Sequence, residues 1–207
     1  MPTKIITGLF DSYDDAKRAV HDLEAAGIPH SDISIVANNA DERYVGEAGH
    51  SGKAATGAGA GATLGTVVGG GAGLLAGLGM LAIPGVGPVV AAGWLISTVA
   101  GAAAGAAVGG AAGGIIGGLT SAGVSKEHAH IYAEGIRRGG TLVTVRVDEG
   151  RIEAAEGIMI EYNAVDPDAR GLAYRESGWK AFDEKAPPYS QAELDRERDR
   201  YRGRAAV

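Results

Sequence analysis

The glycine-rich stretch before Lys53 is the first place where this sequence could carry chemistry, because glycine loops that end in lysine cradle phosphate groups. Gly46 and Gly52 precede Lys53, but the spacing is one residue too long, and Ala54 stands where a phosphate loop needs Ser or Thr. The strict Gly-x-Gly-x-x-Gly fingerprint and the Gly-x-Ser-x-Gly turn are both absent from the chain. We therefore predict no nucleotide cofactor and no serine nucleophile of these kinds.

The histidines and carboxylates are the other groups with catalytic or metal-binding potential. His128 and His130 are two positions apart on an expected helix, so they lie on different faces, and the remaining histidines are scattered. The carboxylates gather at expected helix starts and in the C-terminal tail, where capping and solubility explain them. We expect no metal site, no cofactor and no catalytic residue, which predicts a protein that is not an enzyme.

Composition narrows the class of partner. The chain has 207 residues and a formal net charge of −6, which disfavours nucleic acid as a partner. It contains no cysteine, so disulfides, iron–sulfur clusters and thiol chemistry are excluded. The N-terminal apolar stretch is too short for a secretion signal, so we expect the termini to be in the cytoplasm.

Small residues at every fourth position form the strongest pattern in the sequence. Of the 35 glycines, 22 lie in residues 54–124, a stretch without any charged side chain. Four residues are close to one helical turn, so each series would leave a groove along which two helix backbones can pack closely. We predict helix packing and oligomerisation through Gly57, Gly61, Gly65, Gly69, Gly73, Gly77, Gly93, Ser97, Gly101, Gly105, Gly109, Gly113 and Gly117.

These series predict a glycine-zipper helical hairpin over residues 54–124 that turns at residues 84–88. Each arm is long enough for a bilayer of about 30 Å, although its few strongly apolar residues make insertion of a single arm marginal. Two states stay open. The hairpin either spans the inner membrane with the lipid bilayer as a partner, or it is buried in a cytoplasmic homo-oligomer whose partner is the chain itself. The unbroken spacing argues against a flexible glycine linker.

The flanking residues predict a small α+β domain around this insert. Residues 1–38 have a strand–helix–strand pattern, and residues 139–169 have another that begins with the β-branched strand 141–147. Together they predict a split ferredoxin-like βαβ…βαβ sheet, because neither half has enough apolar surface alone. Residues 39–53 are a polar, glycine-containing linker, and residues 125–138 are a connecting helix that Ser125 caps.

The tail, residues 170–207, is rich in aromatic residues and ends in a charged helix. Ser190 and Glu193 have the spacing of a capping box for this helix. One interpretation is a solvated helix with i,i+4 ion pairs. The other is a clasp in which the aromatic stretch docks on the sheet domain or on a neighbouring subunit, through Tyr174, Trp179, Phe182 and Tyr189.

Two parts of the chain resemble the bacterial heat-induced general stress protein family. They are residues 4–10 with the apolar positions of the following helix and strand, and residues 132–140 with residues 142–145. This resemblance implies a small α+β domain, often with a glycine-zipper insert, that takes part in stress responses. It implies no catalytic residues.

Three hypotheses for function follow. The first is a non-enzymatic, stress-associated membrane protein that oligomerises through its glycine-zipper helices. The second is a cytoplasmic self-assembling structural protein. The third is a small-molecule sensor, which rests on fold analogy alone.

Overall fold

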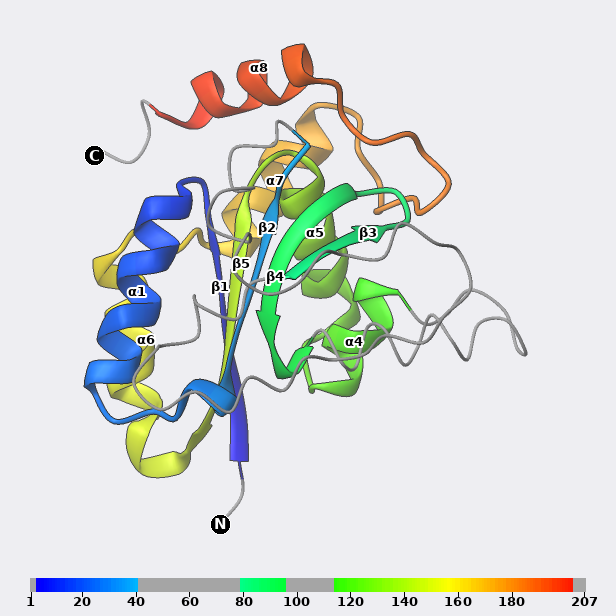
Figure 1. The fold of residues 1–207 in the computed structure, drawn as a ribbon. Coiled ribbons are helices and arrows are strands. Elements are labelled where there is room, and N and C mark those ends of the chain that lie inside the picture. Colours follow the sequence, from blue (N-terminus) through cyan, green and yellow to red (C-terminus); the bar gives the residue numbers. More distant parts are fainter. Residues whose placement is uncertain (1–2, 41–78, 96–113, 203–207) are drawn as a thin grey trace.

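One antiparallel sheet organises the chain (Figure 1). The computed structural model describes residues 3–40, 79–95 and 114–202. The strand order is β1-β5-β2-β4-β3. The strands are β1 (Thr3–Phe10), β2 (Ile33–Asn38), β3 (Gly79–Ile83), β4 (Gly87–Gly93) and β5 (Thr141–Asp148). Leu142 of β5 lies opposite Leu9 on one side and Val36 on the other, so hydrogen bonds join the N-terminal and C-terminal halves in one sheet.

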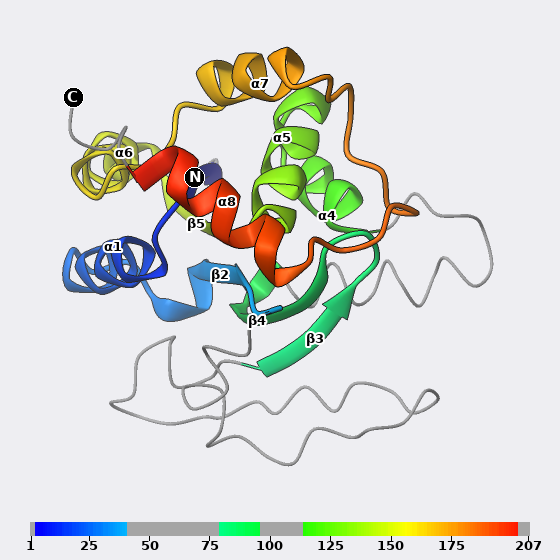
Figure 2. The same cartoon turned by 90° about the horizontal axis from the view of Figure 1, so that it is seen from above.

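Helices cover both faces of this sheet, as Figures 1 and 2 show. The described helices are α1 (Tyr13–Ala25), α4 (Ile115–Ser121), α5 (Lys126–Arg137), α6 (Ile152–Glu161), α7 (Pro167–Glu176) and α8 (Gln191–Arg202), with short 3-10 turns η1 (His30–Asp32) and η3 (Glu149–Arg151). Helices α1 and α6 pack on one face and α4 and α5 on the other, whereas α7 and α8 lie further out. The predicted α+β class is confirmed.

The alternation of side chains along the strands divides the core between these faces. Val90 and Ala92 of β4 belong to the cluster beneath α1 and α6, whereas Val89 and Ala91 belong to the cluster beneath α4 and α5. All six residues of β2 are buried. A strand that is buried on both faces is typical of the centre of a sheet with helices on either side.

Local signals in the sequence account for the helix ends. The Ser12 hydroxyl accepts from the Asp15 amide at the start of α1, and the Ser125 hydroxyl accepts from the His128 amide at the start of α5. Gly27 follows α1 with φ +82°, the left-handed conformation expected after a helix. The Glu193 carboxylate accepts from the Ser190 amide, so the predicted cap of the terminal helix forms.

The expected helical hairpin is wrong for residues 79–93, which form the β-hairpin β3–β4. Gly93 ends β4 instead of lying on a helix. Five residue pairs join β4 to β2, from Ser34 opposite Gly93 to Asn38 opposite Val89. These residues form strands because the outer edge of β2 is buried and its backbone N–H and C=O groups need hydrogen-bond partners, which β4 supplies. The four-residue glycine spacing carries no information about that edge.

This pairing also changes the expected membrane topology. A hairpin that crosses a bilayer would place residues 84–88 on the far side from the sheet domain. Instead, β4 is part of the same sheet as β2, and residues 84–86 form the turn between β3 and β4. Within residues 3–40, 79–95 and 114–202, no helix has the length and apolarity to cross a membrane.

Two details at the C-terminal side differ from the expected boundaries. Val165 makes a single antiparallel bridge to Leu9 instead of a strand. The ferredoxin-like detail therefore stays a prediction, and β3 and β4 extend the other edge of the sheet. The expected boundary between residues 169 and 170 falls inside α7, because Asp166 caps this helix by accepting from the Ala169 amide.

Gly93 gives a direct test of strand against zipper helix. Its φ is +94°, and a Cβ there would lie 2.1 Å from the Ile33 carbonyl oxygen. We expect Gly93→Ala to lower the free energy of unfolding by about 2 kcal/mol or more, measured by urea denaturation.

The matched control is Gly157→Ala in α6, where a Cβ would meet no atom within 4 Å. We expect this control to raise stability by about 0.5–1 kcal/mol, since alanine favours a helix interior. A helical zipper would accept alanine at position 93, so an unchanged unfolding curve for Gly93→Ala would contradict the β-hairpin.

Candidate functional site

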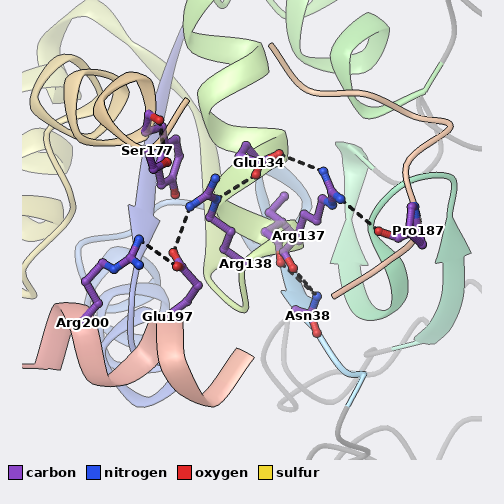
Figure 3. Close-up of polar contacts among 10 residues, drawn as sticks. Asn38, Glu134, Arg137, Arg138, Ser177, Pro187, Glu197 and Arg200 are labelled. Carbon is purple, nitrogen blue, oxygen red and sulfur yellow. Dashed lines mark hydrogen bonds and ion pairs between the residues drawn. The ribbon is translucent and has the colours of Figure 1, made fainter. Parts of the chain in front are cut away.

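The main concentration of buried charge in the described residues lies where the C-terminal tail meets α5 (Figure 3). We call it the arginine–tyrosine junction. It comprises Asp11, Glu134, Arg137, Arg138, Arg170, Tyr174, Tyr189, Glu197 and Tyr201.

The C-terminal end of α5 positions one half of the junction. Glu134 and Arg138 are four residues apart, the spacing at which helix side chains meet. Asn38, at the end of β2, donates from its side-chain amide to the Ile136 carbonyl at 3.0 Å, which anchors this helix end to the sheet (Figure 3). Gly139 then takes φ +98°, which allows the chain to turn from α5 into β5.

Glu134 is the centre of the ion-pair network. Its side chain is 1% exposed and accepts from Arg138 Nε at 2.7 Å and from Arg137 Nη1 at 3.5 Å. Arg138 Nη1 also donates to Glu197 Oε2 of α8 at 3.1 Å, and Arg200 pairs with the other oxygen of Glu197 at 2.9 Å (Figure 3). Two carboxylates from different helices therefore share one buried guanidinium.

A second arginine joins α7 to the end of β1. Arg170 donates to both oxygens of Asp11, at 2.7 and 2.6 Å. Its side chain is 9% exposed, whereas that of Asp11 is 37% exposed. This two-pronged geometry is specific to arginine, because lysine has no planar fork of donors.

Aromatic rings alternate with the guanidinium groups. Arg138 lies 4.3 Å from the Tyr174 ring centroid and 5.7 Å from that of Tyr189, while Arg170 lies 3.7 Å from the Tyr201 ring. Arg137 is 4.9 Å from the Tyr189 ring. Because the faces of aromatic rings attract cations, these rings add to the stabilisation of the arginine charges that the carboxylates provide.

The electrostatics of the junction keep the arginines charged and the central tyrosine neutral. Burial opposes the charge of Arg138, but its hydrogen bond to Glu134 and the Glu134 charge raise its pKa. Burial likewise opposes the charge of Arg170, whose pKa the hydrogen bond and charge of Asp11 raise. Burial raises the pKa of Tyr174, against the attraction of the Arg170 and Arg138 charges.

The junction has little room for a substrate. The cavity between Asp11, Arg138, Arg170, Tyr174 and Glu197 has a volume of about 10 Å³, the size of a single water. Its charged side chains are partners of one another. These ion pairs can hold α5, α7 and α8 against the sheet. An acid–base mechanism would need the same carboxylates, which are already engaged by the arginines.

A second, larger hollow lies at the other end of the sheet. It has a volume of about 650 Å³ and opens to solvent between η1, β5 and η3. Arg146 pairs there with Asp32 at 3.0 Å, and Arg151 lies 3.7 Å from Asp148. Each cation already has a carboxylate partner, so the hollow has no surplus of positive charge. In the part of the chain that the structure describes, no three metal-ligating side chains form a metal-sized group.

The aromatic tail residues are distributed around the junction. Tyr174 is fully buried at its centre, and Trp179 packs edge-on against Tyr174 at 5.5 Å between ring centroids. Phe182 is 6% exposed and belongs to the cluster beneath α4 and α5. Tyr189 is half-buried beside Arg137. The terminal helix buries Leu194, Glu197 and Tyr201 along one face.

The junction was only partly visible in the sequence. The tail aromatics were candidates for docking, whereas Asp11, Glu134, Arg138, Arg170 and Glu197 were not singled out. The available signal was the four-residue spacing of Glu134 and Arg138. The alternating charges of α8 favoured a solvated helix, because its apolar face is only Leu194 and Tyr201.

Most of the predicted zipper positions lie outside the residues that the structure describes. Gly117 lies in the seven-residue helix α4 and Gly93 in β4. The positions outside the described residues are Gly57, Gly61, Gly65, Gly69, Gly73, Gly77, Ser97, Gly101, Gly105, Gly109 and Gly113.

The comparison with protein families finds a similarity in the N-terminal part of the chain. Residues 5–77 match the model of the heat-induced stress protein YflT domain. The match covers about a third of the chain. The resemblance to heat-induced stress proteins is thus confirmed over β1, α1, β2 and the first glycine series, and it suggests a stress-related role. No curated protein and no solved structure matches the chain.

The buried carboxylate of Glu134 should be essential for stability. We expect Glu134→Gln to lower the free energy of unfolding by about 1.5–3 kcal/mol, because Arg138 then keeps Glu197 as its one carboxylate partner. Glu156→Gln, at an exposed position of α6, should change it by less than about 0.5 kcal/mol. Urea denaturation at pH 7 measures both, and equal midpoints would contradict the role of Glu134.

Alkaline pH should weaken the contact between α5 and β1. Burial, with smaller contributions from Asp166 and Asp168, raises the pKa of Tyr132 to about 12. The raised pKa stabilises the fold below the unfolded value of about 10, and this stabilisation is lost as pH rises from about 10 to 12. Between pH 9 and pH 12 the free energy of unfolding should therefore fall by up to about 3 kcal/mol less in Tyr132→Phe than in the unsubstituted chain, measured from urea midpoints. Parallel loss in both proteins would show that Tyr132 does not contribute.

Proposed function

We propose that this chain is a non-enzymatic stress-response protein that acts by association with further copies of itself through its glycine-rich segments. The α+β domain carries these segments, and the arginine–tyrosine junction fastens the tail to the domain. The junction itself has no room for a small-molecule ligand, because its cavity has the size of one water. The hollow of about 650 Å³ at the other end of the sheet is large enough for one, so the small-molecule sensor stays a second candidate function.

The extent of the family match is the observation that carries this proposal. The matched region runs from Ile5 to Gly77. It therefore includes Gly57, Gly65 and Gly73 of the first series as part of the stress domain itself, not as an appendage. Glycine lowers helix stability by about 1 kcal/mol per interior position, so a regular series of this kind suggests close packing against a partner surface.

The position of β3–β4 supports association between protein chains over a single bilayer hairpin. Residues 79–93 separate the two glycine series and belong to the same sheet as β2. If the first glycine series crossed a bilayer, the chain would have to cross back before residue 79 in order to join the sheet. Attachment to the inner membrane, with the lipid bilayer as a second partner, stays a prediction that vesicle flotation of the full chain can test.

Substitutions in the glycine series test the proposal. We expect Gly69→Leu and Gly105→Leu to reduce the particle mass at least about twofold in light scattering, because a side chain would fill the groove between helices. Leu75→Ile, which adds no volume, should leave the mass unchanged. Cells whose only copy carries Gly69→Leu should survive a heat challenge less well than cells with Leu75→Ile.

Equal particle mass for all three variants and the unsubstituted chain would rule out association through these grooves. Normal urea unfolding of each variant separates a loss of association from a loss of folding.

A further inference from the structure

The sheet has two outer edges, and only one of them carries features that prevent pairing with another chain. Strand β1 forms the first edge, where the Val165 amide donates to the Leu9 carbonyl at 2.7 Å and Lys4 adds a charge. Charges and covering segments are common ways in which proteins keep an edge strand from pairing with a further strand. Strand β3 forms the second edge (Figure 2), and among the residues that the structure describes no strand pairs with its outer side.

The backbone of β3 turns hydrogen-bonding groups toward this open edge. Ala82 lies opposite Pro88 in the β3–β4 ladder, two positions along from the pair formed by Met80. The Pro88 carbonyl accepts from the Asn39 amide at 2.9 Å, so the backbone of Pro88 faces β2 and not β3. In an antiparallel ladder, pairs that exchange hydrogen bonds alternate with pairs that do not. The N–H and C=O groups of Met80 and Ala82 therefore point away from β4.

The side chains of this edge also suit contact with another strand. Met80 is 45% exposed and is one of three large apolar side chains that are exposed in the described residues. Ala82 is exposed as well. Residues 79–93 contain no charged side chain, so no charge on the hairpin repels an approaching strand. Free backbone groups beside an exposed apolar side chain favour the addition of a strand.

A second copy of β3 matches this edge by symmetry. When two copies meet antiparallel about Leu81, Met80 of each copy lies opposite Ala82 of the other. Each of these residue pairs can exchange both of its hydrogen bonds, so the outward N–H and C=O groups of both strands are satisfied. The contact has two-fold symmetry, the commonest symmetry of homo-oligomers, and it joins the two sheets edge to edge.

We propose that the outer edge of β3 is a self-association surface, at which two copies of the chain pair their β3 strands antiparallel about Leu81. This inference deepens the proposed function and rests on it for the association between copies, since it names a surface of the described domain at which copies meet. Strand β3 begins two residues after Gly77, the last position of the first glycine series. Edge pairing and groove packing would therefore reinforce each other, as linked contacts do.

Oxidative crosslinking of the purified full-length chain tests the pairing, because the chain has no cysteine of its own. In Met80→Cys/Ala82→Cys each new thiol would lie opposite one in the second copy, at a Cα separation of about 5.5 Å that suits a disulfide. We expect a crosslinked dimer to form at least ~10-fold faster than in Ile160→Cys/Leu172→Cys. These control positions are 72% and 60% exposed on α6 and α7. Mass spectrometry should find links between position 80 of one copy and position 82 of the other.

A proline in β3 gives a second test. Ala82→Pro removes an outward N–H and leaves the hydrogen bonds between β3 and β4 intact. We expect this variant to lower the particle mass in light scattering about twofold, because two-fold pairing at the edge is lost. Ala82→Thr keeps the amide and should leave the mass unchanged. Urea unfolding of both variants separates a loss of association from a loss of folding.

Crosslinking of Met80→Cys/Ala82→Cys no faster than that of the control would overturn self-association at this edge and leave the edge to a strand of another protein. An unchanged particle mass for Ala82→Pro would also overturn it. Failure of the proposed function has a different signature. If Gly69→Leu leaves the mass unchanged while the cysteines of β3 crosslink, groove packing fails and edge pairing stands. Rapid crosslinking between positions 80 and 82, with a lower mass for Ala82→Pro, supports the proposal.

Discussion

The requirement that a buried strand has hydrogen-bond partners on both edges determines much of this structure. Strand β2 is buried on both faces, so neither its amides nor its carbonyls can turn to water. Strand β5 satisfies one edge and β4 the other. Since β5 comes from the C-terminal half and β4 from the middle of the glycine-rich region, this one strand joins three distant parts of the sequence.

The arginine–tyrosine junction attaches the charged C-terminal tail to the sheet domain. Among its described side chains, helix α8 buries Leu194, Glu197 and Tyr201, too little apolar surface to dock by burial alone. Its attachment depends on Glu197, which shares Arg138 with Glu134. A buried arginine with two carboxylates and two tyrosine rings is costly to separate, so the geometry of α5, α7 and α8 is specific even where their apolar contact is small.

Glycine has two distinct roles in this chain. Gly27 follows the amphipathic helix α1, where a left-handed glycine commonly ends a helix, and its φ of +82° agrees with that role. Gly93 was assigned to a helix groove because it continues a four-residue series. Its actual role is a close approach to the Ile33 carbonyl at φ +94°. The four-residue spacing cannot distinguish the expected role of Gly93 from its actual one, because a helix groove and a close approach between strands both require a residue without a Cβ.

The sequence by itself determined the α+β class, the cap at Ser125, the strand around Val143 and the resemblance of the N-terminal part to heat-induced stress proteins. These features depend on residues within one or two turns of each other, where propensity and periodicity act directly. The tertiary structure alone decided that residues 79–93 are strands and that Arg138 and Arg170 clasp the tail. Those outcomes depend on which backbone edges and which buried charges lack partners after the chain has folded, and such deficits arise between residues far apart in the sequence.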